Sequence, residues 1–165
     1  MARTHEAATT VRFYQLANMS LETALVGIVG KAWEREMVVN LLARDVQQAQ
    51  RLDDLFWIHP PHHFLPHGLW SGPDPELQPV LISLEPDDCN GATLLVLAAP
   101  HLLAEPMRFD MIIDFLHGQD AEGLAAGRNR YRHYRDLGCQ MEYWTQAPQG
   151  GWKKQAGAAT TAAEK

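Results

Sequence analysis

Hydrophobic and polar residues follow two different periods along this chain. Residues 11–16 alternate and are rich in β-branched and aromatic types, which predicts a strand. After Ser20, which can cap a helix, apolar residues recur every three or four positions to Trp33, as in a core-facing helix. The apolar run 37–42 is typical of a strand buried on both faces.

The same alternation of strands and helices continues to about residue 145. Asp45 with Gln48 resembles a capping box that opens a helix through about Trp57, and Asp120 can cap a last helix through about Leu137. This order predicts an α/β fold of three layers, with a mostly parallel sheet, Rossmann-like but without a phosphate-binding loop. The further predicted strands are 80–84, 93–98, 111–116 and 140–145.

Length and composition indicate a globular protein. The chain has 165 residues, of which 46% are hydrophobic and 21% charged. We expect a single α/β domain over residues 1–150 and a flexible tail over 151–165, whose last residues are mostly Ala, Thr and Gly. We find no apolar run that could span a membrane, no secretory signal and no disulfide framework, so we expect a cytoplasmic protein.

Residues 59–79 predict a long loop, because they include six prolines and two glycines. Four histidines lie in it: His59, His62, His63 and His67. Imidazole is a common zinc ligand, but no cysteine is adjacent and no HExxH pattern is present. We therefore favour solvated or packed histidines over a metal site, and we expect neither a metal nor a cofactor.

Signals for catalysis are weak. Gly27, Gly30 and Lys31 resemble the end of a phosphate-binding loop, but Ala32 follows the lysine and both glycines lie within a helical period, where we expect them to let the helix pack closely on the sheet. No Gly-x-Ser-x-Gly elbow occurs. A nucleotide-binding or hydrolytic enzyme is therefore only an alternative, suggested by the fold class.

The predicted last helix carries an unusual cluster of positive charge on a chain with a net charge of −6. Arg128, Tyr131, Arg132 and Arg135 fall within an arc of about 100°. Arginine binds carboxylates bidentately, and the phenol adds apolar area, so an acidic peptide with an aromatic anchor would suit this face. A merely solvated basic face and direct binding of single-stranded DNA remain alternatives. The side expected to pack on the sheet comprises Ala126, His133, Tyr134 and Leu137.

A second candidate surface lies at the start and in the middle of the long loop, where five large apolar side chains occur among the prolines. Some of these side chains can be buried in the core, but not readily all five. An exposed apolar patch of this kind would bind another protein. The five residues are Phe56, Trp57, Phe64, Leu65 and Trp70.

Three of these segments carry a family resemblance. Residues 49–57 (AQRLDDLFW), followed by 64–69 (FLPHGL), and residues 128–135 (RNRYRHYR) resemble the chi subunit of bacterial DNA polymerase III. The resemblance covers roughly residues 10–147. It implies a fold related to nucleotide-binding domains, without their phosphate loop, and a non-catalytic accessory role at the clamp-loader complex of the replicative polymerase.

The resemblance also implies partners. Chi proteins bind the acidic C-terminal tail of single-stranded DNA-binding protein, so their contact with DNA is mainly indirect. Arg128, Tyr131 and Arg132 match the tail-binding site by position, while Trp57 and Phe64 match the patch for the psi subunit or a related helicase. Where the family often has a basic residue one turn before Arg128, this chain has leucine at position 124, so we expect a tail contact that is weaker or that uses Arg135 instead.

Overall fold

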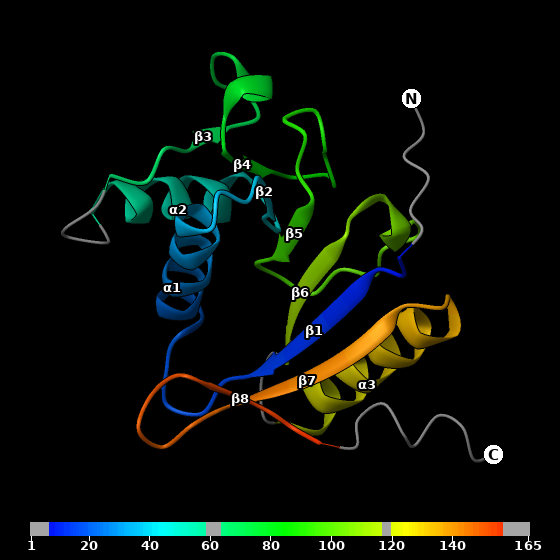
Figure 1. Cartoon of the computed structure of the whole chain (residues 1–165). Coiled ribbons are helices and arrows are strands. Elements are labelled where there is room, and N and C mark those ends of the chain that lie inside the picture. The colour runs from blue at the N-terminus through cyan, green and yellow to red at the C-terminus, as the bar shows by residue number, and fades with distance from the viewer. Residues whose placement is uncertain (1–6, 59–63, 117–119, 157–165) are drawn as a thin grey trace. The chain divides into compact units, whose positions relative to one another are not determined.

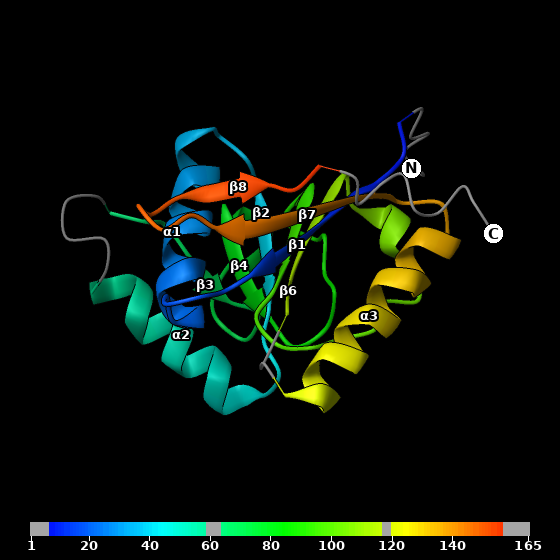
Figure 2. The same ribbon diagram turned by 90° about the horizontal axis from the view of Figure 1, so that it is seen from below.

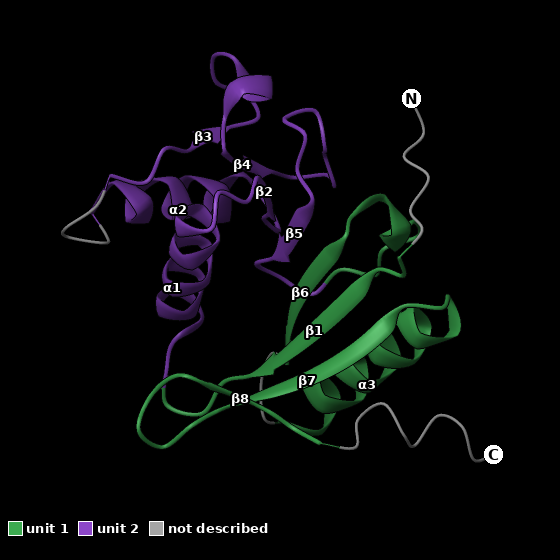
Figure 3. Ribbon diagram, in the orientation of Figure 1, with its two compact units in different colours: residues 1–18, 101–165 green, residues 19–100 purple. Residues whose placement is uncertain are grey.

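The computed structural model describes residues 7–58, 64–116 and 120–156 (Figure 1). The chain divides into two compact units (Figure 3), which are described separately below. Unit 1 comprises residues 1–18 and 101–165, and unit 2 comprises residues 19–100.

Unit 2 contains four parallel strands paired in the order β3-β4-β2-β5. Every residue of β2, β4 and β5 is buried, as the apolar runs in the sequence predict. The short strand β3 lies within the predicted long loop and was not predicted, because two residues carry no periodicity. The elements are α1 (Leu21–Glu34), β2 (Val39–Leu42), α2 (Val46–Ile58), β3 (Gly68–Leu69), the 3-10 helix η1 (Pro75–Leu77), β4 (Val80–Ser83) and β5 (Leu94–Leu97).

Side-chain caps start both helices of unit 2 where the sequence places them. The Thr23 N–H donates to the Ser20 hydroxyl at 3.2 Å, and the Gln48 N–H donates to the Asp45 carboxylate at 2.8 Å. The Gln48 side chain in turn accepts from the Arg44 N–H at 2.7 Å, so the reciprocal half of the capping box reaches one residue further back.

The glycines of α1 have a different role from the one predicted. Gly27 and Gly30 lie inside α1 and not in a strand-to-helix turn, as expected. However, a Cβ atom at either position would meet nothing within 4 Å, so close packing on the sheet does not explain them. The prediction of a tightly packed glycine face is therefore wrong.

Unit 1 has three parallel strands in the order β6-β1-β7, with β8 antiparallel to β7. Figure 2 shows α3 lying along one face of these strands. The elements are β1 (Thr10–Gln15), the 3-10 helix η2 (Pro106–Arg108), β6 (Met111–Leu116), α3 (Ala121–Asp136), β7 (Gln140–Gln146) and β8 (Trp152–Lys154).

Strand β8 lies in the segment predicted as a flexible tail, so that prediction is wrong for Trp152–Lys154. The Trp152 ring meets the Tyr14 ring edge-on at 4.7 Å, and this aromatic contact accompanies the pairing with β7. A single tryptophan in a polar stretch has no periodicity that would have indicated a strand.

The α/β class and the mostly parallel sheet pairing are confirmed in both units. Helix α3 is capped by Asp120, which accepts from the Gly123 N–H at 2.8 Å. Its buried residues are Gly127, Arg130 and Tyr134, so the predicted packing side is only partly correct. Of the described helices, none is both long and apolar enough to cross a membrane.

Candidate functional site

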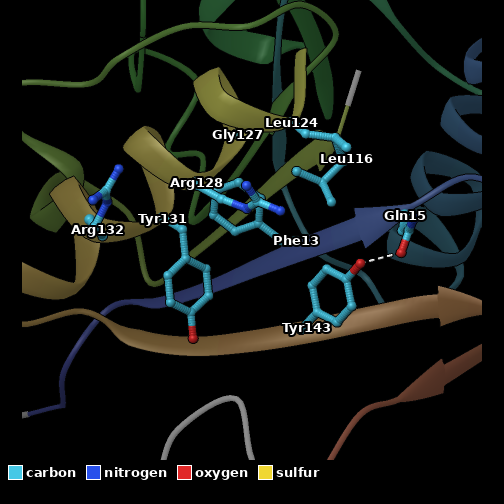
Figure 4. Close-up of a pocket in the computed structure, with 9 residues that line it drawn as sticks. All are labelled: Phe13, Gln15, Leu116, Leu124, Gly127, Arg128, Tyr131, Arg132 and Tyr143. Atoms are coloured by element: carbon cyan, nitrogen blue, oxygen red, sulfur yellow. Dashed lines mark hydrogen bonds between the residues drawn. The ribbon is translucent and has the colours of Figure 1, made fainter. Parts of the chain in front are cut away.

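A cleft of about 760 Å³ opens in unit 1 between α3 and the strands beneath it (Figure 4). We call it the α3 cleft. Its size is in the range of sites that bind small ligands or the end of a peptide. Helix α3 contributes Leu124, Gly127, Arg128, Tyr131 and Arg132, and the strands contribute Phe13, Gln15, Leu116 and Tyr143.

A buried ion pair holds α3 on the strands. The Arg130 Nε donates to the Asp114 carboxylate at 2.8 Å, and its Nη2 donates to the Phe115 carbonyl at 3.1 Å. Burial raises the pKa of Asp114 to about 6, against the opposing effects of the Arg130 charge and the Phe115 N–H. Arg130 lies among these arginines in the sequence, but it is buried, supports the helix and does not line the cleft.

Tyr134 attaches the same helix to the segment before β6. Its hydroxyl donates to the His101 carbonyl at 2.9 Å and accepts from the Leu103 N–H at 3.3 Å. Burial raises the pKa of this phenol, so the hydroxyl remains protonated. These contacts fix the rotation of α3 about its axis, and with it the side chains that the helix presents.

The apolar part of the α3 cleft is built from rings and leucines. The Phe13 ring lies 5.6 Å from the Tyr131 ring, centroid to centroid. A Cβ atom at position 127 would lie 2.3 Å from the Leu116 Cδ2, so only glycine there lets Leu116 lie directly against the helix. Burial raises the pKa of Tyr131, which therefore keeps a neutral hydroxyl beside this surface.

The charged part of the cleft comes from Arg128 and Arg132, both exposed. Within the described residues, no hydrogen bond or ion pair engages either guanidinium. Arg135 differs, because its Nε and Nη2 lie 3.2 and 3.1 Å from the Asp136 carboxylate and it does not line the cleft. Three of the four residues predicted for this site are therefore brought together.

Sequence reasoning missed the strand residues of the cleft. Phe13, Gln15, Leu116 and Tyr143 come from three strands far apart in the sequence, and no local pattern links them to the arginines. Gly127 could have been found, because it lies one residue before Arg128 on the same helix, whereas Leu124 was noted there only for the basic residue that it replaces.

Of the five residues predicted for the second surface, only two have exposed rings. Trp57 is 60% exposed and Phe64 is 69% exposed, with their ring centroids 5.8 Å apart. Of the other members, Phe56 and Leu65 are buried and Trp70 is half-buried. The exposed pair, which we call the Trp57–Phe64 surface, projects from the end of α2 and the segment before β3.

His67 supports this surface from beneath. Its Nδ1 lies 2.7 Å from the Leu65 carbonyl, and its Nε2 lies 3.2 Å from the Asp53 carboxylate. Its ring also packs 4.8 Å from the Trp57 ring, centroid to centroid. This buried histidine packs the loop, whereas His59, His62 and His63 lie outside the described residues. In the part of the chain that the structure describes, no three His, Cys, Asp or Glu residues gather as metal ligands.

Comparison with known proteins identifies a family and a fold. Residues 8–142 match the family described as DNA polymerase III chi subunit, HolC. The probable DNA polymerase III subunit chi of Rickettsia prowazekii (strain Madrid E) is 26% identical over 151 residues, which is 86% of this chain and 88% of the relative. The DNA polymerase III subunit chi of Escherichia coli (strain K12) is 27% identical over 124 residues, or 74% and 83% of the two chains.

Among solved structures, the crystal structure of T4 UvsW superposes with a TM-score of 0.59 at 10% identity. The match covers 84% of this chain but only 41% of the solved one, so the chain spans about two fifths of that protein. At this identity the likeness shows a shared fold and nothing about function.

Proposed function

The chain belongs to the DNA polymerase III chi subunit family, and we propose that it acts in the cytoplasm as a non-catalytic adaptor that links the clamp-loader complex to single-stranded DNA-binding protein. In this proposal, the α3 cleft binds the acidic C-terminal tail of the coating protein. The observation that carries the proposal is the combination, within one cleft, of two guanidinium groups that no described residue engages and an aromatic-lined apolar wall.

This combination fits an acidic peptide that ends in an aromatic residue. Arg128 and Arg132 can donate to carboxylates, each charged hydrogen bond contributing about 1.5–3 kcal/mol. The wall made by Phe13, Leu116 and Leu124 can accept a ring, whose burial contributes roughly 1.5–3 kcal/mol. After the costs of association and ordering, we expect a micromolar affinity, about −8 kcal/mol, which suits an exchangeable contact.

Arg135 has a secondary place in this proposal. Its contact with Asp136 already satisfies part of its guanidinium, and it lies outside the cleft lining. It remains on the same helix, so its charge can attract an acidic tail over about one Debye length, roughly 10 Å. Leu124, which replaces the basic residue frequent in the family, extends the apolar wall instead.

The proposal is tested by titrating a fluorescent peptide of the coating protein's C-terminal tail against the wild-type chain and the variants Arg128→Ala and Tyr131→Ala. We expect each variant to fold normally and to bind at least about tenfold more weakly, from the loss of one charged contact or one ring. Unchanged affinity in both variants would remove the proposed site. Tight binding of a bare oligonucleotide, or stabilisation by nucleotides, would favour the alternatives instead.

For the Trp57–Phe64 surface we propose a protein partner: the psi subunit or a related helicase. Two neighbouring rings exposed at 60% and 69% are the type of aromatic anchor that dominates protein interfaces. We expect Trp57→Ala with Phe64→Ala to abolish co-purification with that partner. Leu77→Ala is the matched control, because Leu77 is an equally exposed apolar residue (73%) of the same unit. Equal losses in both variants would argue against a specific surface.

A further inference from the structure

The α3 cleft contains a neutral polar pair that the proposed tail contacts do not use. Gln15 is the last residue of β1, and Tyr143 lies on the neighbouring strand β7, opposite Phe13. The Tyr143 hydroxyl donates to the Gln15 Oε1, as the dashed line in Figure 4 shows. Burial raises the pKa of Tyr143, so the phenol keeps the proton with which it donates.

This contact orients the Gln15 side chain. A carboxamide has one oxygen acceptor and one NH₂ group with two donors. Because Tyr143 engages the oxygen, the NH₂ group must point elsewhere, and within the described residues no hydrogen bond engages it. Both residues line the cleft, so donors are available there to a ligand.

The position of Gln15 complements the arginines. In Figure 4, Gln15 and Tyr143 lie toward one side of the cleft and Arg132 lies toward the other, with Arg128 between them. The cleft therefore offers charged donors in its middle and at one side, and a neutral donor at the other side. Such an arrangement can hold two separate points of one extended peptide.

The chain is anchored just after Gln15, so this donor is preorganised. The Ala17 and Asn18 N–H groups both donate to the Gln146 side-chain oxygen, at 3.1 and 3.0 Å. These bonds tie the end of β1 to the end of β7. A ligand that binds Gln15 therefore orders little additional backbone, which favours affinity.

We propose that Gln15, oriented by Tyr143, is a second anchor of the α3 cleft and donates a hydrogen bond to an oxygen of the bound tail peptide. Gln15 contacts the peptide directly, whereas Tyr143 is a positioning residue that acts through Gln15. This inference rests on the proposed function. The oxygen is a main-chain carbonyl or a side-chain carboxylate, which have the same acceptor chemistry.

A double-mutant cycle with the fluorescent tail peptide tests the inference. We expect Gln15→Ala to weaken binding by about three- to tenfold, as for one neutral hydrogen bond. Tyr143→Phe should weaken binding by about twofold alone and cause no further loss in the Gln15→Ala background, because its effect passes through Gln15. Gln15→Glu should bind more weakly still, because it presents an oxygen acceptor to an oxygen.

Gln140→Ala is the matched control, since Gln140 is an exposed glutamine at the far end of β7. Unchanged affinity in Gln15→Ala, together with weak binding by Arg128→Ala, would overturn this inference alone. Unchanged affinity in both would overturn the proposed site as well. Peptides with one acidic residue at a time replaced by alanine, which removes the side-chain oxygens, separate the two oxygen sources: the Gln15→Ala effect persists in every peptide for a main-chain carbonyl and disappears when the contacted carboxylate is removed.

Discussion

Arg130 on α3 and Asp114 on β6 form an ion pair with 2.8 Å between Nε and Oδ2, and their side chains are 7% and 0% exposed. Successive helix residues advance by about 100°, so residues two positions to either side of Arg130 point almost directly away from it. Burying Arg130 therefore turns Arg128 and Arg132 outward together. One buried arginine thus determines which other arginines can bind a ligand.

We expect Arg130→Ala to reduce the free energy of unfolding by about 3–5 kcal/mol, because it leaves the Asp114 carboxylate buried without its partner. Urea unfolding at pH 8 measures this loss. Arg132→Ala is the control on the same helix and should change stability by less than about 0.5 kcal/mol, as an exposed substitution. Similar losses in both variants would contradict a structural role particular to Arg130.

The pKa of Asp114, raised to about 6 by burial, predicts a pH dependence of stability. A carboxyl whose pKa is higher in the folded state binds protons more tightly there, so its stabilising contribution is present below pH 4 and is lost as the pH rises to about 6. In Asp114→Asn this titration is absent. Urea unfolding of both proteins from pH 4 to 8 measures their free energies of unfolding. The free energy of unfolding of the wild type should fall relative to that of Asp114→Asn as the pH rises to about 6, and the difference should stay constant above about pH 7.

Gly127→Ala should narrow the α3 cleft, because its Cβ would lie 2.3 Å from the Leu116 Cδ2 and must displace that side chain. We expect a weaker tail-peptide affinity in a folded protein, measured by the same fluorescence titration. Gly30→Ala is the matched helical control, since a Cβ there meets nothing within 4 Å. It should raise stability by up to about 1 kcal/mol through helix propensity and leave affinity unchanged. Full affinity in Gly127→Ala would mean that Leu116 does not shape the site.

His67→Phe keeps a ring beneath Trp57 but leaves the Leu65 carbonyl and the Asp53 carboxylate without their partner. We expect a loss of about 1–3 kcal/mol in the free energy of unfolding and a changed environment of the Trp57 indole. Chemical denaturation and the indole N–H resonance in a ¹H–¹⁵N spectrum measure these effects. The exposed His101→Ala serves as control, and an unshifted Trp57 resonance in His67→Phe would count against a supporting role.

Salt should weaken tail binding, because the Arg128 and Arg132 charges are exposed and screened over roughly 10 Å at 0.1 M salt. Affinities measured between 50 and about 300 mM NaCl should fall more steeply for the wild type than for Arg128→Ala, which lacks one of the charges. Parallel salt dependences would indicate that Arg128 makes no electrostatic contribution.

Local sequence patterns predicted the elements well. The polar caps Ser20, Asp45 and Asp120 mark the starts of α1, α2 and α3 within one residue, because each satisfies N–H groups of the helix that follows it. The periodicity of α3 also placed Arg128, Tyr131 and Arg132 on one face. It misassigned Ala126 and Leu137, which are exposed, because a helical period shows that a face exists but not how the helix is turned.

The sequence by itself determined the α/β class, the helix starts, the arginine-rich face and the family resemblance, since all of these depend on residues close together along the chain. Only the tertiary structure decided that Arg130 is buried, that Leu116 lies against Gly127 and that Gln15 meets Tyr143 in the same cleft. The physical reason is that each of these contacts joins two different elements, a helix and a strand for Arg130 and Gly127 and two strands 128 positions apart for Gln15, and a partner on another element decides whether a charge is buried or presented.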